Sequence, residues 1–384
     1  MSVLSICIPT YNRREIAYRC ALNALRSKNK NIEVVICDNG SNDGTYEKLS
    51  TITDNRLRLF QNAENMGGAY NFRRVLKESK SKFAMLLSDE DILLHGQLDE
   101  LIACISNNKN ISAVLTTGLL DISLLREKTN TYTLHSQGFS AYVVAFQFNY
   151  LSGMVYNTKL MDYEIEQCTL YPSVSIAHQL ALKGNIIKSD IATFAFSRDN
   201  PGNPFYTDNG KMHSNIYEAA YDNTSLKKEI IYAYFEPSAR LTQFKTEVQR
   251  AMKHGFNECE MGILISDRYY TFINYFAVFF SNYTDFFEKQ LKHNVEHYNE
   301  LLNSGRALKR YMHKAIRETS DFIIDITGKE FWQTIKECLI ALVNQVDNVE
   351  KFLDKLDVVD RTVAVQLIAR VRPSINQLSE HFQR

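Results

Sequence analysis

The stretch IEVVICDNGSNDGTYEKLSTI (residues 32–52) passes from one type of secondary structure to another. Its first part, IEVVICD, is a short apolar run with several β-branched residues, which is typical of a buried strand. The NGSNDG segment that follows is typical of a turn, and Asn42 or Asp43 is placed to cap the helix that begins in NDGTYEKLSTI. The stretch therefore predicts a strand, a turn and a helix in this order.

The same alternation continues on both sides of this stretch. Apolar runs predict strands at 3–9, 57–61 and 82–88, and apolar residues at helical spacing predict helices at 12–28 and 67–79. Strands separated by helix-length segments favour a mostly parallel sheet with right-handed crossovers. Ligands bind such sheets at the carboxyl ends of the strands. We therefore expect the polar segments PTYNR, DNGSNDGT and SDED, which follow three of these strands, to meet at one edge.

The pattern changes twice further along the chain. Between 112 and 200 it is looser, although ISAVLTT and DIATFAFS are typical of strands, and the segment 198–210 is rich in proline and glycine, which marks a loop or a boundary. From about residue 213 onward proline is rare and amphipathic stretches such as 331–371 predict helices. We predict an α/β domain over 1–212 and an all-helical part over 213–384.

Composition excludes some classes of protein. Lys and Arg together number 44, as do Asp and Glu, so no global basic field favours a nucleic-acid partner. The seven cysteines form no C-x-x-C pair and several lie in apolar runs, which predicts reduced core residues of an intracellular protein. The N-terminal residues lack the features of a signal peptide, and no uninterrupted apolar run is long enough to span a membrane. We therefore expect a cytoplasmic protein.

Two segments of the C-terminal part raise further alternatives. The segment 269–287 carries aromatic residues at helical spacing, which predicts a buried helix and leaves contact with a membrane surface as the alternative. The segment HNVEH (293–297) places His293 and His297 on one helical face, but Asn294 stands where a zinc protease needs glutamate, so a solvated face is favoured. We expect the helical part to contact an acceptor, a second subunit or a membrane surface.

Three consecutive acids, Asp89, Glu90 and Asp91, end the apolar run of residues 82–88. Like charges this close repel one another and raise a pKa unless a cation lies among them. Two carboxylates at i and i+2 after a buried strand can hold Mg²⁺ or Mn²⁺ together with the phosphates of a substrate. The alternative is a solvated acidic turn or the cap of the next helix.

Two other polar segments are candidates for binding a nucleotide. Asp38 follows a buried strand and can accept hydrogen bonds from a nucleoside, although an ordinary strand–turn–helix connection explains it equally well. The glycines at 67–68 permit close backbone approach, and Asn71, Arg73 or Arg74 can reach a diphosphate; the alternative is a solvated basic helix face. Neither a P-loop nor a G-x-G-x-x-G fingerprint occurs in the chain.

The segments IPTYNR, DNGSNDGT, NMGGAYN and LLSDED, in this order, resemble the inverting glycosyltransferases of family 2, which have the GT-A fold. The resemblance covers about residues 3–200. It implies a nucleoside-diphosphate sugar as donor and a hydroxyl of a glycan or lipid-linked acceptor, in bacterial surface polysaccharide synthesis, with a hexose or deoxyhexose transferred. It also implies that the nucleoside pocket is lined by Pro9, Thr10, Tyr11 and Asp38, that Asp89 lies near the ribose and the metal, and that Asp91 is the main metal ligand.

The general base is where the sequence departs from the family. Inverting transfer needs a base for the acceptor proton, and family members usually carry an acidic pair in the helix that here reads YPSVSIAHQLALKG (171–184). This helix contains no acid, so His178 is the candidate base. The alternatives are Asp162, Glu164, Asp190, Asp199 and Asp208. A catalytically silent nucleotide-sugar binder or assembly subunit therefore stays open as a second interpretation.

Overall fold

The computed structural model describes residues 2–119, 130–148, 150–163, 172–196, 237–272, 314, 316–344 and 353–371. The chain divides into two compact units, Met1–Gly210 and Lys211–Arg384, which are described separately below. The segment 293–297, for which a solvated helix face is predicted, and most of the aromatic segment 269–287 lie outside the described residues.

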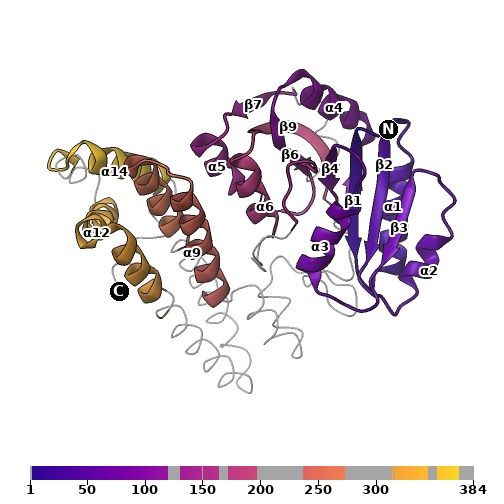
Figure 1. The fold of residues 1–384 in the computed structure, drawn as a ribbon, viewed down its shortest axis with the longest axis horizontal. Helices are drawn as coiled ribbons and strands as arrows, with labels where there is room; N and C mark the ends of the chain where they lie inside the picture. Colours follow the sequence, from indigo (N-terminus) through magenta and orange to yellow (C-terminus); the bar gives the residue numbers. More distant parts are fainter. Residues whose placement is uncertain are drawn as a thin grey trace, which may run out of the picture. The chain divides into compact units, whose positions relative to one another are not determined.

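The N-terminal unit alternates strands and helices along the chain (Figure 1). Its elements are β1 (Leu4–Thr10), α1 (Arg14–Leu25), β2 (Ile32–Asp38), α2 (Thr45–Ser50), β3 (Leu57–Gln61), α3 (Gly68–Lys77), β4 (Phe83–Leu86), β5 (Ile92–Leu93), the 3₁₀ turn η1 (His95–Gln97), α4 (Leu98–Asn107), β6 (Ile111–Leu119), β7 (Tyr132–His135), α5 (Phe139–Ala145), β8 (Met154–Asn157), α6 (Pro172–Ala181) and β9 (Asn185–Ala195). The predicted strands at 32–38 and 57–61 are confirmed to the residue.

The described strands form one sheet of nine, in the order β3-β2-β1-β4-β8-β6-β9-β5, with β7 also paired to β9. The pairs among β1, β2, β3 and β4 are parallel, as is the pair β6–β9, whereas β8 lies antiparallel between β4 and β6. Six strands therefore run in one direction, and β5, β7 and β8 run against them. This arrangement confirms the predicted mostly parallel sheet.

Alternating residues of β1 explain how helices cover both faces of the sheet. Leu4, Ile6 and Ile8 lie in the main apolar core with the buried residues of α1 and α4. The residues between them face α3, since the Cys7 thiol lies 3.6 Å from the carbonyl of Val75. Strands buried on both faces read as continuous apolar runs, which is why these strands were predictable.

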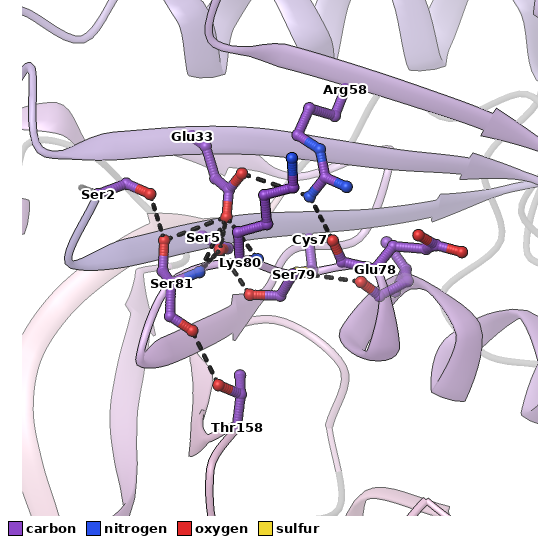
Figure 2. A network of polar contacts seen from close by, with 11 residues as sticks. Ser2, Ser5, Cys7, Glu33, Arg58, Glu78, Ser79, Lys80, Ser81 and Thr158 are labelled. Carbon is purple, nitrogen blue, oxygen red and sulfur yellow. Dashed lines mark hydrogen bonds and ion pairs between the residues drawn. The ribbon is translucent and has the colours of Figure 1, made fainter.

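The amino ends of the strands are joined by a polar network around Glu33 of β2 (Figure 2). The Glu33 carboxylate accepts hydrogen bonds from Ser5 Oγ (2.5 Å), from the backbone N–H of Lys80 (2.8 Å) and from the N–H and hydroxyl of Ser81 (both 3.1 Å), and Arg58 lies 3.5 Å away. The network fixes the loop between α3 and β4 to the sheet.

The described part of the C-terminal unit is helical, as predicted. Its elements include α9 (Pro237–Lys253), α12 (Lys329–Asn344) and α14 (Val358–Val371). They share an apolar core in which the Trp332 ring meets the Tyr269 ring edge-on at 4.7 Å. No helix among the residues described is long and apolar enough to cross a membrane. The contacts predicted for this unit stay predictions.

Candidate functional site

The carboxyl ends of the central strands meet at one edge of the sheet, as the sequence predicts. Residues are paired in register between Thr10 and Asp38, and between Cys7 and Leu86, so the loops after β1, β2 and β4 leave the sheet side by side. The turn before β8 joins them, because the N–H of Gly153 donates to the carbonyl of Leu86 at 3.0 Å. Four segments far apart in the sequence therefore border one site.

Thr10 connects the two acidic parts of this edge. Its buried hydroxyl donates to Asp89 Oδ2 at 2.6 Å. Its carbonyl accepts the N–H of Asn39, the residue after Asp38, at 2.9 Å. A single residue at the end of β1 thus links the loop of Asp38 to the acids that follow β4.

Arg13 supplies a positive charge that contacts two of the three acids, Asp89 and Glu90. Its Nη1 lies 3.1 Å from Asp89 Oδ1 and 2.7 Å from Glu90 Oε2, with the arginine side chain 26% exposed. Burial alone would lower the pKa of Arg13, but the charges of Asp89 and Glu90 outweigh it and raise that pKa. The sequence analysis missed Arg13, although it ends the IPTYNR segment, because nothing in the sequence places it beside acids 76 residues away.

The hydrogen-bond partners of Asp89 do not fully replace the water that its carboxylate loses on burial. Burial raises the pKa of Asp89 to about 6; Arg13 and Thr10 lower it, and the neighbouring charge of Glu90 raises it. A carboxylate favours its charged form when donors replace the lost water. The two groups that face Asp89 therefore compensate only part of its burial.

Asp91 is held by a different pair of residues. Its buried Oδ2 accepts hydrogen bonds from Ser152 Oγ at 2.6 Å and from the Tyr150 hydroxyl at 3.3 Å. The Ser152 hydroxyl in turn accepts the N–H of Ser88 at 2.8 Å. Ser152 and Tyr150 were also missed, because the short antiparallel strand β8, which brings them to this edge, was not predicted.

The acids fit a hard divalent cation only if a substrate helps to hold it. Among the residues described there is no group of three or more His, Cys, Asp or Glu side chains that can hold a metal ion. Mg²⁺ and Mn²⁺ bind carboxylate oxygens and are often held by one or two carboxylates, with water and substrate phosphates completing the shell. Both oxygens of Asp89 already accept protein hydrogen bonds. Asp91 as the main metal ligand, with Asp89 beside it, stays a prediction.

The loop after β2 is built around the carboxylate of Asp38. Its Oδ2 accepts hydrogen bonds from the N–H of Ser41 and from Gln61 Nε2, both at 3.1 Å, and its Oδ1 accepts the Ser41 hydroxyl. Gly40 has a φ of +72°, and a Cβ there would lie 2.5 Å from the carbonyl carbon of Glu64. Since Asp38 is fully buried, a nucleoside has to displace Ser41 or Gln61 to reach it. The nucleoside contact stays a prediction.

Asn12 joins the loops after β1 and β2. It adopts a left-handed backbone with φ of 50°, its Oδ1 accepts the N–H of Asn42 at 3.0 Å, and its own N–H donates to Ser41 Oγ at 2.7 Å. Asparagine tolerates this conformation better than most residues. The neighbouring Tyr11 is exposed and Pro9 half-buried, and their predicted contacts with a nucleoside stay predictions.

Asn71 belongs to the framework of the site, which corrects its predicted contact with a diphosphate. The residue is buried in α3, and its amide donates to the carbonyls of Cys37 at 2.8 Å and Thr10 at 3.3 Å. The amide thus holds the ends of β1 and β2 together. Arg74 similarly donates to the carbonyl of Gln61 at 2.9 Å. Arg73 lies half-buried on α3, and its phosphate contact stays a prediction.

His178 packs in the core, which corrects its assignment as candidate base. Its ring is fully buried, stacks on the Tyr142 ring at 4.1 Å and meets the Phe146 ring edge-on at 4.2 Å. An acceptor hydroxyl cannot reach a ring enclosed between α5 and α6.

The alternative bases are also away from the acidic edge or outside the described residues. Asp190 accepts two hydrogen bonds from Thr131 beside β7. Asp162 follows β8, which runs toward the opposite edge, where the N–H of Thr158 donates to the carbonyl of Lys82. Glu164, Asp199 and Asp208 lie outside the described residues.

A mostly parallel α/β sheet with an acidic carboxyl edge defines a candidate nucleotide-binding domain. Residues 5–150, which include this edge, match the family model of glycosyl transferase family 2. The chain therefore contains a family 2 glycosyltransferase domain.

Curated relatives match the same part of the chain. The UDP-Glc:alpha-D-GlcNAc-diphosphoundecaprenol beta-1,3-glucosyltransferase WfaP of Escherichia coli is 29% identical over 109 residues, which is 28% of this chain and 43% of that protein. The abequosyltransferase RfbV of Salmonella typhimurium is 30% identical over 102 residues, 25% of this chain and 30% of that protein. The chain thus matches less than half the length of these relatives.

Among solved structures, S. aureus TarS 1–349 in complex with UDP-GlcNAc is similar with a TM-score of 0.48 and 15% identity. The similarity covers 87% of this chain and 90% of that one.

Proposed function

We propose that this chain is a metal-dependent inverting glycosyltransferase that moves a sugar from a nucleoside-diphosphate donor to a hydroxyl of a glycan or lipid-linked acceptor in bacterial surface polysaccharide synthesis. The observation that carries the proposal is the gathering of Asp38, Asp89 and Asp91 at one edge of the sheet, joined through Thr10. The family match over residues 5–150 covers this same edge.

The names of the relatives suggest the first substrates to test. Two relatives from Escherichia coli are UDP-Glc:alpha-D-GlcNAc-diphosphoundecaprenol beta-1,3-glucosyltransferases, and one from Campylobacter jejuni is a beta-1,3-glucosyltransferase for an undecaprenol-linked glycan. We therefore take UDP-glucose and GlcNAc-diphosphoundecaprenol as the first donor and acceptor. The abequosyltransferase relative keeps the transferred sugar open. A lipid-linked acceptor places the enzyme at the inner face of the membrane, as a monomer or a homo-oligomer.

The chemistry follows from the arrangement of charge. The acceptor oxygen forms a bond to the anomeric carbon while the bond from that carbon to the diphosphate oxygen breaks, and the electron pair leaves with the diphosphate. The acceptor proton passes to a base on the opposite face of the sugar. Asp91 would hold the divalent cation, which would supply Lewis-acid stabilisation of the leaving diphosphate.

The residues of the chain prepare the edge for this charge transfer. Ser152 and Tyr150 orient the Asp91 carboxylate through its Oδ2. Arg13 neutralises part of the charge of Asp89 and Glu90, so that fewer uncompensated anions face the incoming diphosphate. Thr10 holds Asp89 in place from the end of β1.

A two-step experiment tests the proposal with the full chain. Thermal unfolding is first measured with UDP, GDP and dTDP and their glucose derivatives, with and without Mn²⁺, because a selective ligand raises apparent stability by mass action. UDP release and the mass of the lipid product are then measured with UDP-glucose and GlcNAc-diphosphoundecaprenol. Acceptor-dependent release that requires a divalent cation is expected. Absence of binding by every nucleotide in the panel would contradict the proposal.

A second candidate is a silent nucleotide-sugar binder or assembly subunit. The burial of His178 favours keeping this second candidate, because the described alternative bases, Asp162 and Asp190, also lie away from the acidic edge. This alternative predicts nucleotide-sugar binding in the thermal panel and no acceptor-dependent release of diphosphate with any acceptor. The same two measurements therefore separate both candidates.

A further inference from the structure

The turn that carries Tyr150 is fixed to the sheet next to the acids. The N–H of Gly153 donates to the carbonyl of Leu86, and its carbonyl accepts the N–H of Thr116, both at 3.0 Å. Gly153 has a φ of +78°, and a Cβ there would lie 2.5 Å from Thr116 Oγ1 and 2.6 Å from the Phe194 ring. The turn therefore packs directly on β6 and β9, and its position leaves little freedom.

The ring of Tyr150 is held on several sides and is nevertheless 41% exposed. It lies parallel to the Phe194 ring at 5.8 Å, with an interplanar angle of 9°, and meets the Phe196 ring at 5.0 Å and 66°. Its hydroxyl donates to Asp91 Oδ2. A single exposed aromatic side chain needs no explanation, but this one is fixed by two aromatic neighbours and by a hydrogen bond to the candidate metal ligand.

The order of strands places Tyr150 on one particular side of the acids. Asp38 ends β2, the acids follow β4, and Tyr150 precedes β8, which is the next strand on the far side of β4. A donor with its nucleoside near Asp38 and its diphosphate near Asp91 directs its sugar away from β2. The sugar that is transferred and the sugar that accepts it therefore lie on the Tyr150 side of the acids.

The chemistry of a tyrosine ring suits a pyranose. The π-face is apolar with partial negative charge, so it attracts the weakly positive C–H groups on one face of a sugar ring. Small-molecule sites commonly combine such an aromatic wall with a few fixed polar groups.

We propose that Tyr150 is a specificity-determining residue whose exposed ring packs against a pyranose bound beside Asp91. The inference rests on the proposed transferase function and names the sugar contact within that site. The pyranose comes from the donor or from the acceptor, and the two arms of the test distinguish them.

The test compares Tyr150→Leu, which removes the aromatic face, with Tyr150→Phe, which keeps it, in the full chain. The first arm measures the affinity ratio between UDP-glucose and UDP, and the same ratio for the GDP and dTDP pairs. The second arm measures KM for GlcNAc-diphosphoundecaprenol. Tyr132→Leu is the matched control, because Tyr132 is 46% exposed on β7, a strand that pairs with β9 alone among the described strands.

A pyranose contact predicts that Tyr150→Leu changes one of the two quantities that report sugar binding, the affinity ratio or the KM, about tenfold. A fall in the affinity ratio assigns the donor sugar, and a rise in KM for the lipid assigns the acceptor sugar. Tyr150→Phe should stay within about twofold of the wild type in that quantity, and Tyr132→Leu should be unchanged. Thermal unfolding of each variant without ligand establishes first that it is folded.

Two different results would overturn the inference. If both quantities are unchanged in Tyr150→Leu while the wild type binds nucleotides and transfers sugar, the sugar contact is wrong and the function stands. If Tyr150→Phe loses as much as Tyr150→Leu, the hydroxyl and not the ring face is responsible, and the stacking is wrong. A wild type that binds none of the six nucleotides would overturn the proposed function, and this inference with it.

Discussion

Two buried carboxylates at opposite edges of the same sheet differ in how their charge is compensated. Glu33, at the amino edge, is 7% exposed, and Asp89, at the carboxyl edge, is 5% exposed. Burial is the largest influence on both and by itself raises each pKa. In Glu33 the hydrogen bonds from Ser5, Lys80 and Ser81 outweigh it, so the pKa of Glu33 lies below its usual value (Figure 2). In Asp89 the contacts with Arg13 and Thr10 do not outweigh burial, so the pKa of Asp89 lies above its usual value.

The difference follows from the donors that surround each group. Glu33 is surrounded by neutral hydroxyl and backbone N–H donors, with one arginine at 3.5 Å, and no acid adjoins it in sequence. Asp89 has one hydroxyl and one arginine, and it shares that arginine with Glu90. The donors around Glu33 outweigh its burial, whereas those around Asp89 compensate only part of its burial. Sites that bind charged ligands commonly carry such perturbed groups.

The largest expected effect is on catalysis at the carboxyl edge. Asp91→Asn keeps the shape and the bonds to Oδ2 but removes the charge that holds a divalent cation, so we expect acceptor-dependent UDP release to fall at least a hundredfold. Thermal unfolding without ligand should change little. Glu100→Gln, an exposed acid on α4, is the control and should keep wild-type turnover. Unchanged turnover in Asp91→Asn would contradict the proposed role of Asp91 as the residue that holds the divalent cation.

The second expected effect is the pH dependence of stability due to Asp89. Its folded pKa, about 6, lies above the ordinary 3.8, so the folded state holds a proton that the unfolded state has lost between these pH values. Stability of the metal-free protein therefore falls through this window as pH rises, by about 3 kcal/mol relative to Asp89→Asn. Urea unfolding of both proteins at pH 4, 5, 6 and 7, followed by circular dichroism, measures it. If the stability difference between the wild type and Asp89→Asn does not change with pH, the donors around Asp89 fully compensate its burial.

Removal of Arg13 tests whether it compensates the acids. Arg13→Met removes the cation that Asp89 and Glu90 share, and since the arginine is partly exposed we expect a loss of about 2 kcal/mol of stability. The double variant Arg13→Met, Glu90→Gln should recover part of it, because one of the two facing charges is gone. A double variant that loses as much as Arg13→Met alone would show that the ion pairs are not coupled.

The sequence allowed the framework of the acidic edge to be predicted, but not its partners. The strands ending at Asp38 and Leu86 are continuous apolar runs buried on both faces, so their positions and the meeting of their polar ends followed from local pattern. Arg13 lies in a segment that was recognised, yet its fork meets acids 76 residues away, which only the folded sheet determines.

The residues that were missed or misassigned depend on tertiary pairing. Tyr150 and Ser152 reach the edge because β8, only four residues long, inserts antiparallel between β4 and β6, and a run of four residues carries no periodic signal. His178 and Asn71 were assigned by their chemistry. In the structure, His178 is buried between two helices, and Asn71 donates hydrogen bonds to the carbonyls of two strands. Composition does not reveal either of these structural roles.

The smallest expected effect is at the amino edge, and its sign is opposite to that of Asp89. The pKa of Glu33 is lowered from its ordinary 4.5, so its ionised form stabilises the fold above pH 4.5 and this contribution is lost as the pH falls through the lower folded value. We expect Glu33→Gln to be about 1 kcal/mol less stable than the wild type at pH 7, and the difference to shrink below pH 4.5.

The same urea series, extended to pH 3, measures this difference, with Glu100→Gln as the exposed control. Donor binding should be unaffected in Glu33→Gln, because the network lies at the edge opposite to Asp91. A difference that grows as the pH falls would place Glu33 in the same uncompensated class as Asp89. The contrast between the two edges would then have to be sought in geometry, because hydrogen-bond donors would no longer separate them.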